Sequence, residues 1–167
     1  MTTPVFREEQ RFRQTWVLVI VLGVGGLVWW TFIRQIWLGQ PVGQNPGPDW
    51  LAWLLWVLFG LALPYFFLQS RLILEVTDQS IAIRFYPLTR RVIALSDIRS
   101  VEVRTYNAIK EYGGWGIKGW TRKNVAYNVS GNSGVQLTLR DERKVMLGSQ
   151  KPQELMAAIE AQMASAK

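Results

Sequence analysis

Seven residues in the second half of the chain combine cations with aromatic rings and are the first candidates for a functional surface. They are Lys110, Tyr112, Trp115, Lys118, Trp120, Arg122 and Lys123. Aromatic rings insert at a membrane interface, and ammonium and guanidinium groups beside them bind phosphate. The stretch therefore predicts contact with a membrane surface or with a protein partner. In the alternative interpretation, Trp115 and Ile117 fill a hydrophobic core and the charges are merely solvated.

Residues 114–119 read GWGIKG, which matches the glycine pattern of dinucleotide-binding loops. Such a loop needs a buried strand before it and a helix after it, because the helix N-terminus holds the pyrophosphate. Here AIKEY precedes the glycines closely and the polar, strand-like WTRKN follows them. We therefore expect no nucleotide and interpret the segment as a bent strand or loop with close backbone approach.

The residue types that carry most catalysis are missing. The 167-residue chain has no His and no Cys, which removes the commonest general base, thiolate metal ligands and disulfides. The carboxylates Asp97, Glu102 and Glu111 are separated, and Asp141 and Glu142 form a turn pair. The sequence predicts a protein that is not an enzyme, with no catalytic residues, no metal ligands and no cofactor.

Two apolar stretches in the first 70 residues are long enough to position the rest of the chain at a membrane. They run from Trp16 to Ile33 and from Trp50 to Leu68. At 1.5 Å per helical residue each spans roughly 27–29 Å, close to the hydrocarbon thickness of a bilayer. A signal peptide is the alternative for the first stretch, but the run is too long and no small-residue cleavage site follows. We expect a transmembrane hairpin over residues 15–69, with helices at about 16–36 and 50–68.

The flanking charges predict the topology of this hairpin. The segment from Trp37 to Asp49 between the helices contains no Lys or Arg, whereas cations flank both outer ends: Arg7, Arg11, Arg13, Arg71, Arg84, Arg90 and Arg91. The positive-inside rule then places residues 1–14, residues 70–167 and both termini in the cytoplasm. Arg34 is the one discordant charge, and it lies near a helix end where it can snorkel to the interface.

Tryptophan is concentrated in the hairpin. These residues mostly cluster toward the outer helix ends: Trp16, Trp29, Trp30, Trp37, Trp50, Trp53 and Trp56. An aromatic belt at the membrane interface explains them, and a pigment or quinone pocket is the alternative. The glycines Gly23, Gly25 and Gly26 favour close contact with Gly60 and Ala62 on the second helix.

The apolar period changes from helical to alternating after residue 70. Leu72, Leu74 and Val76 alternate with Ile73 and Glu75, and short runs of the same kind recur between turn signals up to residue 147. Short strands joined by tight turns are typical of a sandwich or barrel, and we expect an antiparallel sheet over residues 70–150. Residues 152–166 are compatible with one C-terminal helix that covers the sheet.

Residues 70–167 together with the hairpin resemble small bacterial membrane proteins that carry a pleckstrin-homology-like (PH-like, bacterial PH) domain. The segments that carry the resemblance are GGWGIK at 113–118, AY at 126–127, VSG at 129–131, GVQL at 134–137 and PQEL at 152–155. The resemblance implies a membrane α-hairpin plus an all-β PH-like sandwich or barrel with one C-terminal helix. It also implies the bacterial inner (cytoplasmic) membrane. Such families are largely of unknown function.

The charge distribution indicates the class of partner. The net charge is +7, and residues 71–167 contribute 15 Lys or Arg against 9 Asp or Glu. A basic domain beside a bilayer favours anionic lipid head groups over nucleic acid. We expect a non-enzymatic, multi-pass membrane protein that presents an interaction module at the cytoplasmic surface, in contact with lipid or a membrane protein. The alternative is an accessory or assembly subunit of a larger membrane complex, which docks through its Trp-rich hairpin.

Overall fold

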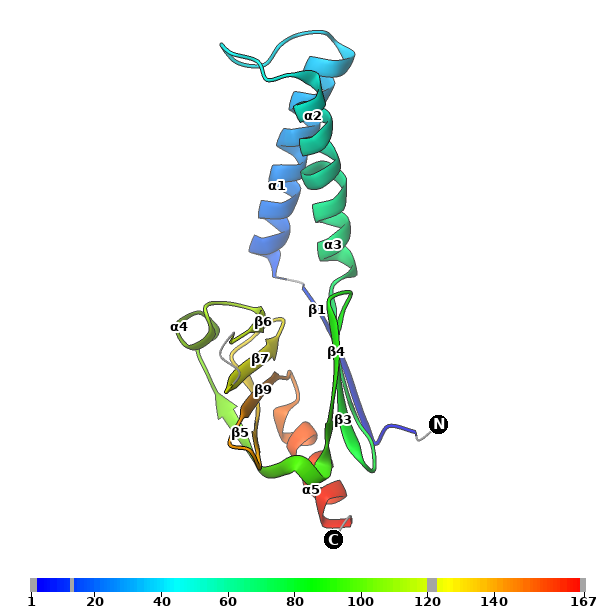
Figure 1. Cartoon of the computed structure of the whole chain (residues 1–167), viewed down its shortest axis with the longest axis vertical. Helices are drawn as coiled ribbons and strands as arrows, with labels where there is room; N and C mark the ends of the chain where they lie inside the picture. The colour runs from blue at the N-terminus through cyan, green and yellow to red at the C-terminus, as the bar shows by residue number, and fades with distance from the viewer. Residues whose placement is uncertain (1–2, 13, 120–122, 166–167) are drawn as a thin grey trace. The chain divides into compact units, whose positions relative to one another are not determined.

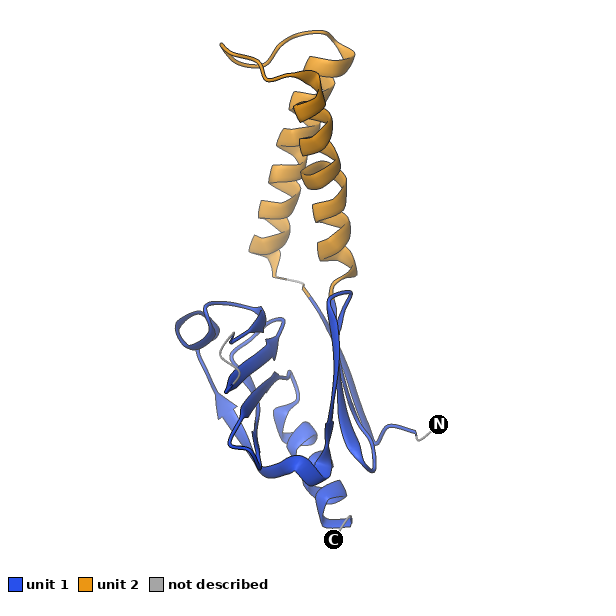
Figure 2. Cartoon of the chain, in the orientation of Figure 1, with its two compact units in different colours: residues 1–11, 71–167 blue, residues 12–70 orange. Residues whose placement is uncertain are grey.

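The structure is a computed structural model that describes residues 3–12, 14–119 and 123–165. The chain forms two compact units, coloured separately in Figure 2. One unit contains residues 12–70, and the other combines residues 1–11 with residues 71–167. The second unit is therefore discontinuous in sequence, because the helical unit is inserted after its first strand.

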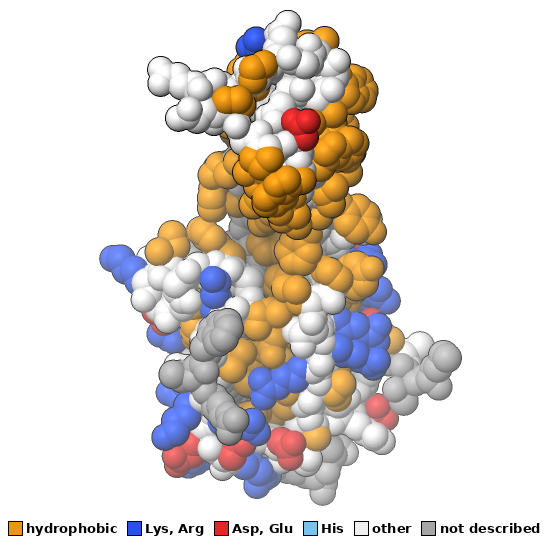
Figure 3. Space-filling model, turned by 45° about the horizontal axis from the view of Figure 1, so that its top comes forward, with side chains coloured by type: hydrophobic (Ala, Val, Ile, Leu, Met, Phe, Trp, Pro, Cys, Tyr) orange, Lys and Arg blue, Asp and Glu red, His pale blue; other side chains and the backbone are white. Residues whose placement is uncertain are grey.

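The helical unit contains two long apolar helices. The first consists of α1 (Thr15–Phe32) and a π-helical end, η1 (Ile33–Trp37), and the second of α2 (Asp49–Leu55), η2 (Trp56–Ala62) and α3 (Leu63–Gln69). They are 23 and 21 residues long, and both are long and apolar enough to cross a membrane. Hydrophobic side chains cover most of the helix surface turned toward the viewer in Figure 3. Leu22, for example, is 64% exposed.

A proline and two small residues set the contact between these helices. Gly25 faces Phe59 and Pro64, where an added Cβ would lie 3.6 Å from the proline ring. Pro64 has no N–H to donate to the carbonyl of Gly60 four residues earlier. The indole Nε1 of Trp29 donates to that carbonyl instead, at 3.2 Å. Gly25 and Gly60 thus lie in the helix contact, whereas an added Cβ at Gly23 would meet nothing within 4 Å.

Part of the tryptophan set is used inside the helix pair. Phe32 is 2% exposed and contacts two indoles, edge-on to Trp53 and stacked on Trp56, with ring centroids 4.7 Å apart in each case. Trp29 meets Trp56 edge-on at 5.1 Å. These aromatic contacts join α1 to the second helix, which the interpretation of all seven tryptophans as an interfacial belt did not anticipate.

The first sheet has the order β1-β2-β3-β4 and is antiparallel throughout. Its strands are β1 (Phe6–Arg11), β2 (Arg71–Val76), β3 (Ser80–Tyr86) and β4 (Thr89–Ala94). The alternation read from the sequence of β2 and β3 is confirmed, since the inward side chains are completely or almost completely buried: Leu72, Leu74, Val76, Ile81, Ile83 and Phe85. These side chains form the core face, and the opposite face, here called the outer face, is partly covered because Ile73 and Ala82 on it are each only 8% exposed.

The second sheet has the order β5-β8-β9-β7-β6. After the turn η3 (Leu95–Asp97) come β5 (Ile98–Thr105), the short helix α4 (Ala108–Tyr112), β6 (Gly116–Lys118), β7 (Asn124–Asn128), β8 (Ser133–Leu139) and β9 (Lys144–Gly148). The prediction of an entirely antiparallel sheet is wrong at one place, because β7 pairs with β9 in parallel. Strand β9 forms an antiparallel hairpin with β8 and occupies the position between β8 and β7, so it runs in the direction of β7.

The helix α5 (Pro152–Ser165) ends the described chain and lies between the two sheets in Figure 1. It contacts β5 and β8 of one sheet and β1 and β2 of the other. Leu155 and Ile159, one turn apart on the helix, are completely buried. The predicted C-terminal helix and its apolar stripe are thus confirmed, and the helix completes a core shared by both sheets.

The strand β1 was not predicted, because its sequence FREEQR lacks apolar alternation. Its inward residues are Glu8 and Gln10, which are 8% and 5% exposed. Gln10 donates from Nε2 to the carbonyl of Gly148 at 2.8 Å. Glu8 accepts hydrogen bonds from the Ser149 hydroxyl and the Gln150 N–H, at 2.5 and 2.8 Å. The N-terminal segment is therefore part of the β unit, held by polar contacts to the end of β9.

Candidate functional site

The basic, aromatic stretch predicted from the sequence begins on the short helix α4. Asn107 caps this helix, its Oδ1 accepting from the N–H of Lys110 at 3.0 Å, and Gly113 ends it with a φ of 75°. The side chain of Lys110 is exposed, whereas Tyr112 is half-buried. The helix thus separates a solvated cation from an aromatic ring that turns toward the protein.

The aromatic residues of the stretch pack on a small hydrophobic cluster. Tyr112 and Trp115 contact buried residues of the second sheet and its loops, which are Tyr106, Ala108, Ala126 and Met146. Trp115 is half-buried and donates from Nε1 to the carbonyl of Gly131 at 3.3 Å. These contacts are what a packing role requires, and they leave only part of each ring accessible to a membrane.

Burial has an electrostatic consequence for the two tyrosines. Desolvation raises the pKa of the Tyr106 phenol above its ordinary value, and the pKa of Tyr112 is raised for the same reason. Their rings meet edge-on with centroids 5.8 Å apart. Both therefore stay neutral near pH 7 and act as packing groups rather than as bases.

The remaining predicted site residues fall within positions 118–123. Lys118 is half-buried on β6, and Lys123 is exposed before β7, where its carbonyl accepts from the N–H of Lys144 at 2.8 Å. Trp120 and Arg122 lie outside the described residues. Within the described ranges the ammonium groups of Lys110, Lys118 and Lys123 form no ion pair, so they are available to an anion.

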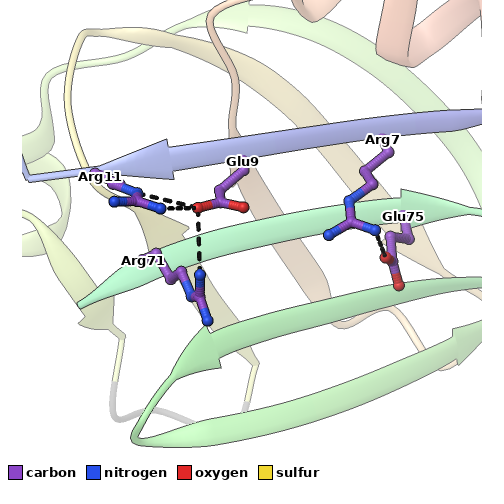
Figure 4. Close-up of polar contacts among 5 residues, drawn as sticks. All are labelled: Arg7, Glu9, Arg11, Arg71 and Glu75. Carbon is purple, nitrogen blue, oxygen red and sulfur yellow. Dashed lines mark hydrogen bonds and ion pairs between the residues drawn. The ribbon is translucent and has the colours of Figure 1, made fainter. Parts of the chain in front are cut away.

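A network of ion pairs lies on the outer face of the first sheet, and part of it is shown in Figure 4. Arg11 and Arg71 are direct cross-strand partners, and both guanidinium groups approach Glu9, at 2.9 and 3.5 Å. Arg7 pairs with Glu75 at 3.4 Å. The hydrogen bond from Arg11 holds the pKa of Glu9 below its ordinary value. Glu9 is therefore shared by two arginines.

The sequence analysis used these arginines only as a topology signal. Register brings two more onto the same face, because Arg84 on β3 is the cross-strand partner of Arg90 on β4. Arg84 reaches Glu75 at 3.1 Å. The outer face thus carries five arginines, at positions 7, 11, 71, 84 and 90, against two glutamates. The period of two in these strands was the available signal, but their pairing order was needed to use it.

The described residues contain no group of three His, Cys, Asp or Glu side chains able to hold a metal ion. Comparison with known proteins identifies one family. The sequence model of a protein family described as "Family of unknown function (DUF6141)" matches residues 1–166. A search of curated proteins gave no significant match.

Proposed function

The chain belongs to this family of unknown function, and we propose that it is a non-enzymatic membrane protein whose two long helices span a bilayer. The β unit then serves as an interaction module at the membrane surface. The observation that carries the proposal is the exposed apolar surface of both helices. Large exposed side chains follow one another along them, including Val19, Leu22, Leu27, Leu58 and Leu68. An uninterrupted apolar surface of this length is unfavourable in water and favourable in lipid.

Strand pairing supports one orientation for the two spans. Arg11 and Arg71 are Cα partners in the first sheet, α1 begins at Thr15, and α3 ends at Gln69. The chain therefore enters and leaves the helical unit from neighbouring strands of one sheet. Both ends of the hairpin lie on the same side of the membrane in this proposal, and the arginine-rich flanks favour the cytoplasmic side.

A PH-like assignment and a bacterial inner-membrane location remain part of the proposal. Two sheets of mostly antiparallel strands with a C-terminal helix support a PH-like architecture. Two features differ from the antiparallel sandwich expected for residues 70–150. Strand β1 precedes the two long helices in the sequence, and β7 pairs with β9 in parallel. The partners we propose for the module are anionic lipid head groups or a neighbouring membrane protein.

The absence of cysteine permits a direct test of topology. Gln44→Cys places a unique thiol between the helices, and Asp78→Cys places one in the exposed turn between β2 and β3. In intact cells a membrane-impermeant maleimide should label the thiol at position 44 and spare the one at 78, and both should react after permeabilisation. Labelling of both in intact cells, or recovery of the full chain in the soluble fraction without detergent, would contradict the proposal.

The second candidate function is an accessory subunit of a membrane complex that docks through the hairpin. The observation in its favour is the exposure of tryptophans not used between the helices, including Trp30 at 49% and Trp50 at 65%. An interfacial belt explains the same exposure. In mild detergent, an accessory subunit should migrate with a larger complex, and Trp50→Leu should release it. If the protein extracted from native membranes in mild detergent migrates at the size of the chain alone, this function is excluded.

A further inference from the structure

The outer face of the first sheet has an open hollow of about 480 Å³ at the β3–β4 turn. Its lining combines cations with apolar groups, and its principal members are Arg71, Arg84, Tyr86, Leu88 and Arg90. The guanidinium of Arg71 lies over the ring of Tyr86, 5.3 Å from the ring centroid. Tyr86 and Leu88 are 47% and 58% exposed. The hollow thus offers positive charge and exposed apolar surface side by side.

The charges in this hollow are not balanced by the described residues. Arg84 and Arg90 are directly opposite each other, and like charges in such a pair destabilise a sheet because their Cβ atoms lie about 4.5–5.5 Å apart. Glu75 pairs with Arg84 but also with Arg7. Arg90 forms no ion pair within residues 3–12, 14–119 and 123–165. An anion between Arg84 and Arg90 would remove the repulsion.

The guanidinium groups of Arg71 and Arg84 are also incompletely hydrogen-bonded within the protein. The Nε atoms of Arg71 and Arg84 are buried, and neither has a hydrogen-bond partner among the described residues. A buried, charged donor without an acceptor is unfavourable, and phosphate oxygens accept from guanidinium groups in paired geometry. The hollow therefore still offers guanidinium donors to an added oxyanion such as a phosphate, beyond the carboxylates of Glu9 and Glu75.

Chain connectivity indicates where that phosphate comes from. Arg71 follows Gln69, the last residue of the second long helix, by two positions, which is at most about 7 Å of chain. Tyr86 is the cross-strand partner of Arg71, and Arg84 lies two residues before Tyr86 on β3, about 7 Å away. If the helices span a bilayer, the hollow starts within the depth of the lipid head groups. Exposed Leu88 and Tyr86 suit the same interface.

From these observations we infer that the hollow formed by Arg71, Arg84, Tyr86, Leu88 and Arg90 binds the phosphate of an anionic lipid head group. The inference rests on the proposed membrane function and places the lipid contact on β2–β4 rather than on the basic stretch at residues 110–123. In this arrangement the guanidinium groups of Arg84 and Arg90 bind the phosphate oxygens. Arg71, whose guanidinium lies over the ring of Tyr86, adds positive charge, and Leu88 contacts the boundary between the lipid head groups and the acyl chains.

The test uses the full chain, purified in mild detergent, freed of lipid and mixed with equal amounts of phosphatidylglycerol and phosphatidylcholine with the same acyl chains. Native mass spectrometry should show the chain retaining mostly phosphatidylglycerol. One arginine near an anionic surface contributes about a fivefold preference. Arg84→Gln with Arg90→Gln should therefore lower the preference about 25-fold. Lys110→Gln with Lys118→Gln removes the same charge elsewhere and should leave it nearly unchanged.

Several results would overturn the inference. They are equal retention of both lipids by the wild type, an unchanged preference in the arginine double variant, and loss of phosphatidylglycerol to inorganic phosphate at millimolar concentration. The last would show that the hollow is a site for free phosphate. A chain that is soluble without detergent would overturn the proposed function together with this inference, whereas an embedded chain without lipid preference overturns the inference alone.

A second measurement does not depend on the folding of the arginine variant. In lipid nanodiscs that contain phosphatidylglycerol, a polarity-sensitive dye on Leu88→Cys should report an apolar environment. The same dye on Asp78→Cys, in the turn at the opposite end of β2, should report water. Similar spectra at the two positions would contradict placement of the hollow at the lipid surface.

Discussion

The buried carboxylate of Glu8 provides a sharp test of how the N-terminal strand is held. Glu8→Ala removes the acceptor of two hydrogen bonds, one from the Ser149 hydroxyl at 2.5 Å and one from the Gln150 N–H at 2.8 Å. Ser149 is 2% exposed, so its hydroxyl loses a partner where water has little access. Leaving a buried donor unpaired costs about 1–3 kcal/mol, and we expect Glu8→Ala to lower the free energy of unfolding of the β unit by about 2–4 kcal/mol.

Glu9→Ala is the matched control on the same strand. Its carboxylate lies on the opposite face and interacts with Arg11 and Arg71 near solvent. Ion pairs of this kind contribute about 0–1 kcal/mol because water and salt screen them. The contrast between the two variants therefore separates the buried attachment of β1 from its surface charge pairs.

Hydrogen exchange of the full chain in detergent is the suitable assay, because it reports the β unit separately from the helices. A loss of 2–4 kcal/mol should accelerate exchange of the most protected amides in β2 and β9 by about 30- to 900-fold. Glu9→Ala should change the same amides by less than about fivefold. If the two variants exchange alike, the contacts from Glu8 do not stabilise the unit and the reasoning is refuted.

Three further outcomes follow from the packing. Ile159→Asp places a charge at a completely buried position of α5 and should leave the β unit unfolded, as a loss of amide protection would reveal; normal protection would contradict the shared core. Trp115→Ala should lower the unfolding midpoint of the full chain by several degrees and leave phosphatidylglycerol retention unchanged, since the ring packs on the Tyr106 cluster; reduced retention at unchanged stability would instead favour membrane insertion. Burial raises the pKa of Tyr106, so the folded state favours the neutral phenol. The contribution of this preference to the free energy of unfolding is fully present below the unfolded pKa of about 10, and it is lost as the pH rises through the folded pKa. Tyr106→Phe should therefore reduce the loss of thermal stability between about pH 9 and 11, and an identical alkaline decline in both proteins would argue against it.

Residue periodicity was sufficient to predict much of the local structure. Long uncharged runs predict helices because every backbone group is satisfied within the segment, whatever surrounds it. The alternation in β2 and β3 identified Leu72, Leu74 and Ile83 as buried, since a strand side chain changes face at each residue. The stripe through Leu155 and Ile159 predicted α5 for the same local reason.

Tertiary structure decided the features that depend on partners distant in sequence. Strand β1 has no apolar pattern, and Glu8 and Gln10 become inward residues only because Ser149 and Gly148 supply matching polar groups. The parallel pairing of β7 with β9 depends on which strand occupies the space beside β8. Neither the inclusion of β1 in the first sheet nor the parallel pairing of β7 with β9 can be predicted from the spacing of residues within one segment.

The candidate functional surfaces also show which features the sequence predicts and which depend on tertiary structure. Sequence proximity indicated the stretch from Lys110 to Lys123, but Tyr112 and Trp115 pack on a hydrophobic cluster. The arginines at 71, 84 and 90 are far apart in sequence and meet only because β2, β3 and β4 pair in register. The sequence alone determined that the chain is basic, has two long apolar runs within residues 16–68 and lacks His and Cys. The grouping of these arginines is a property of strand pairing, which joins residues that the linear chain keeps apart.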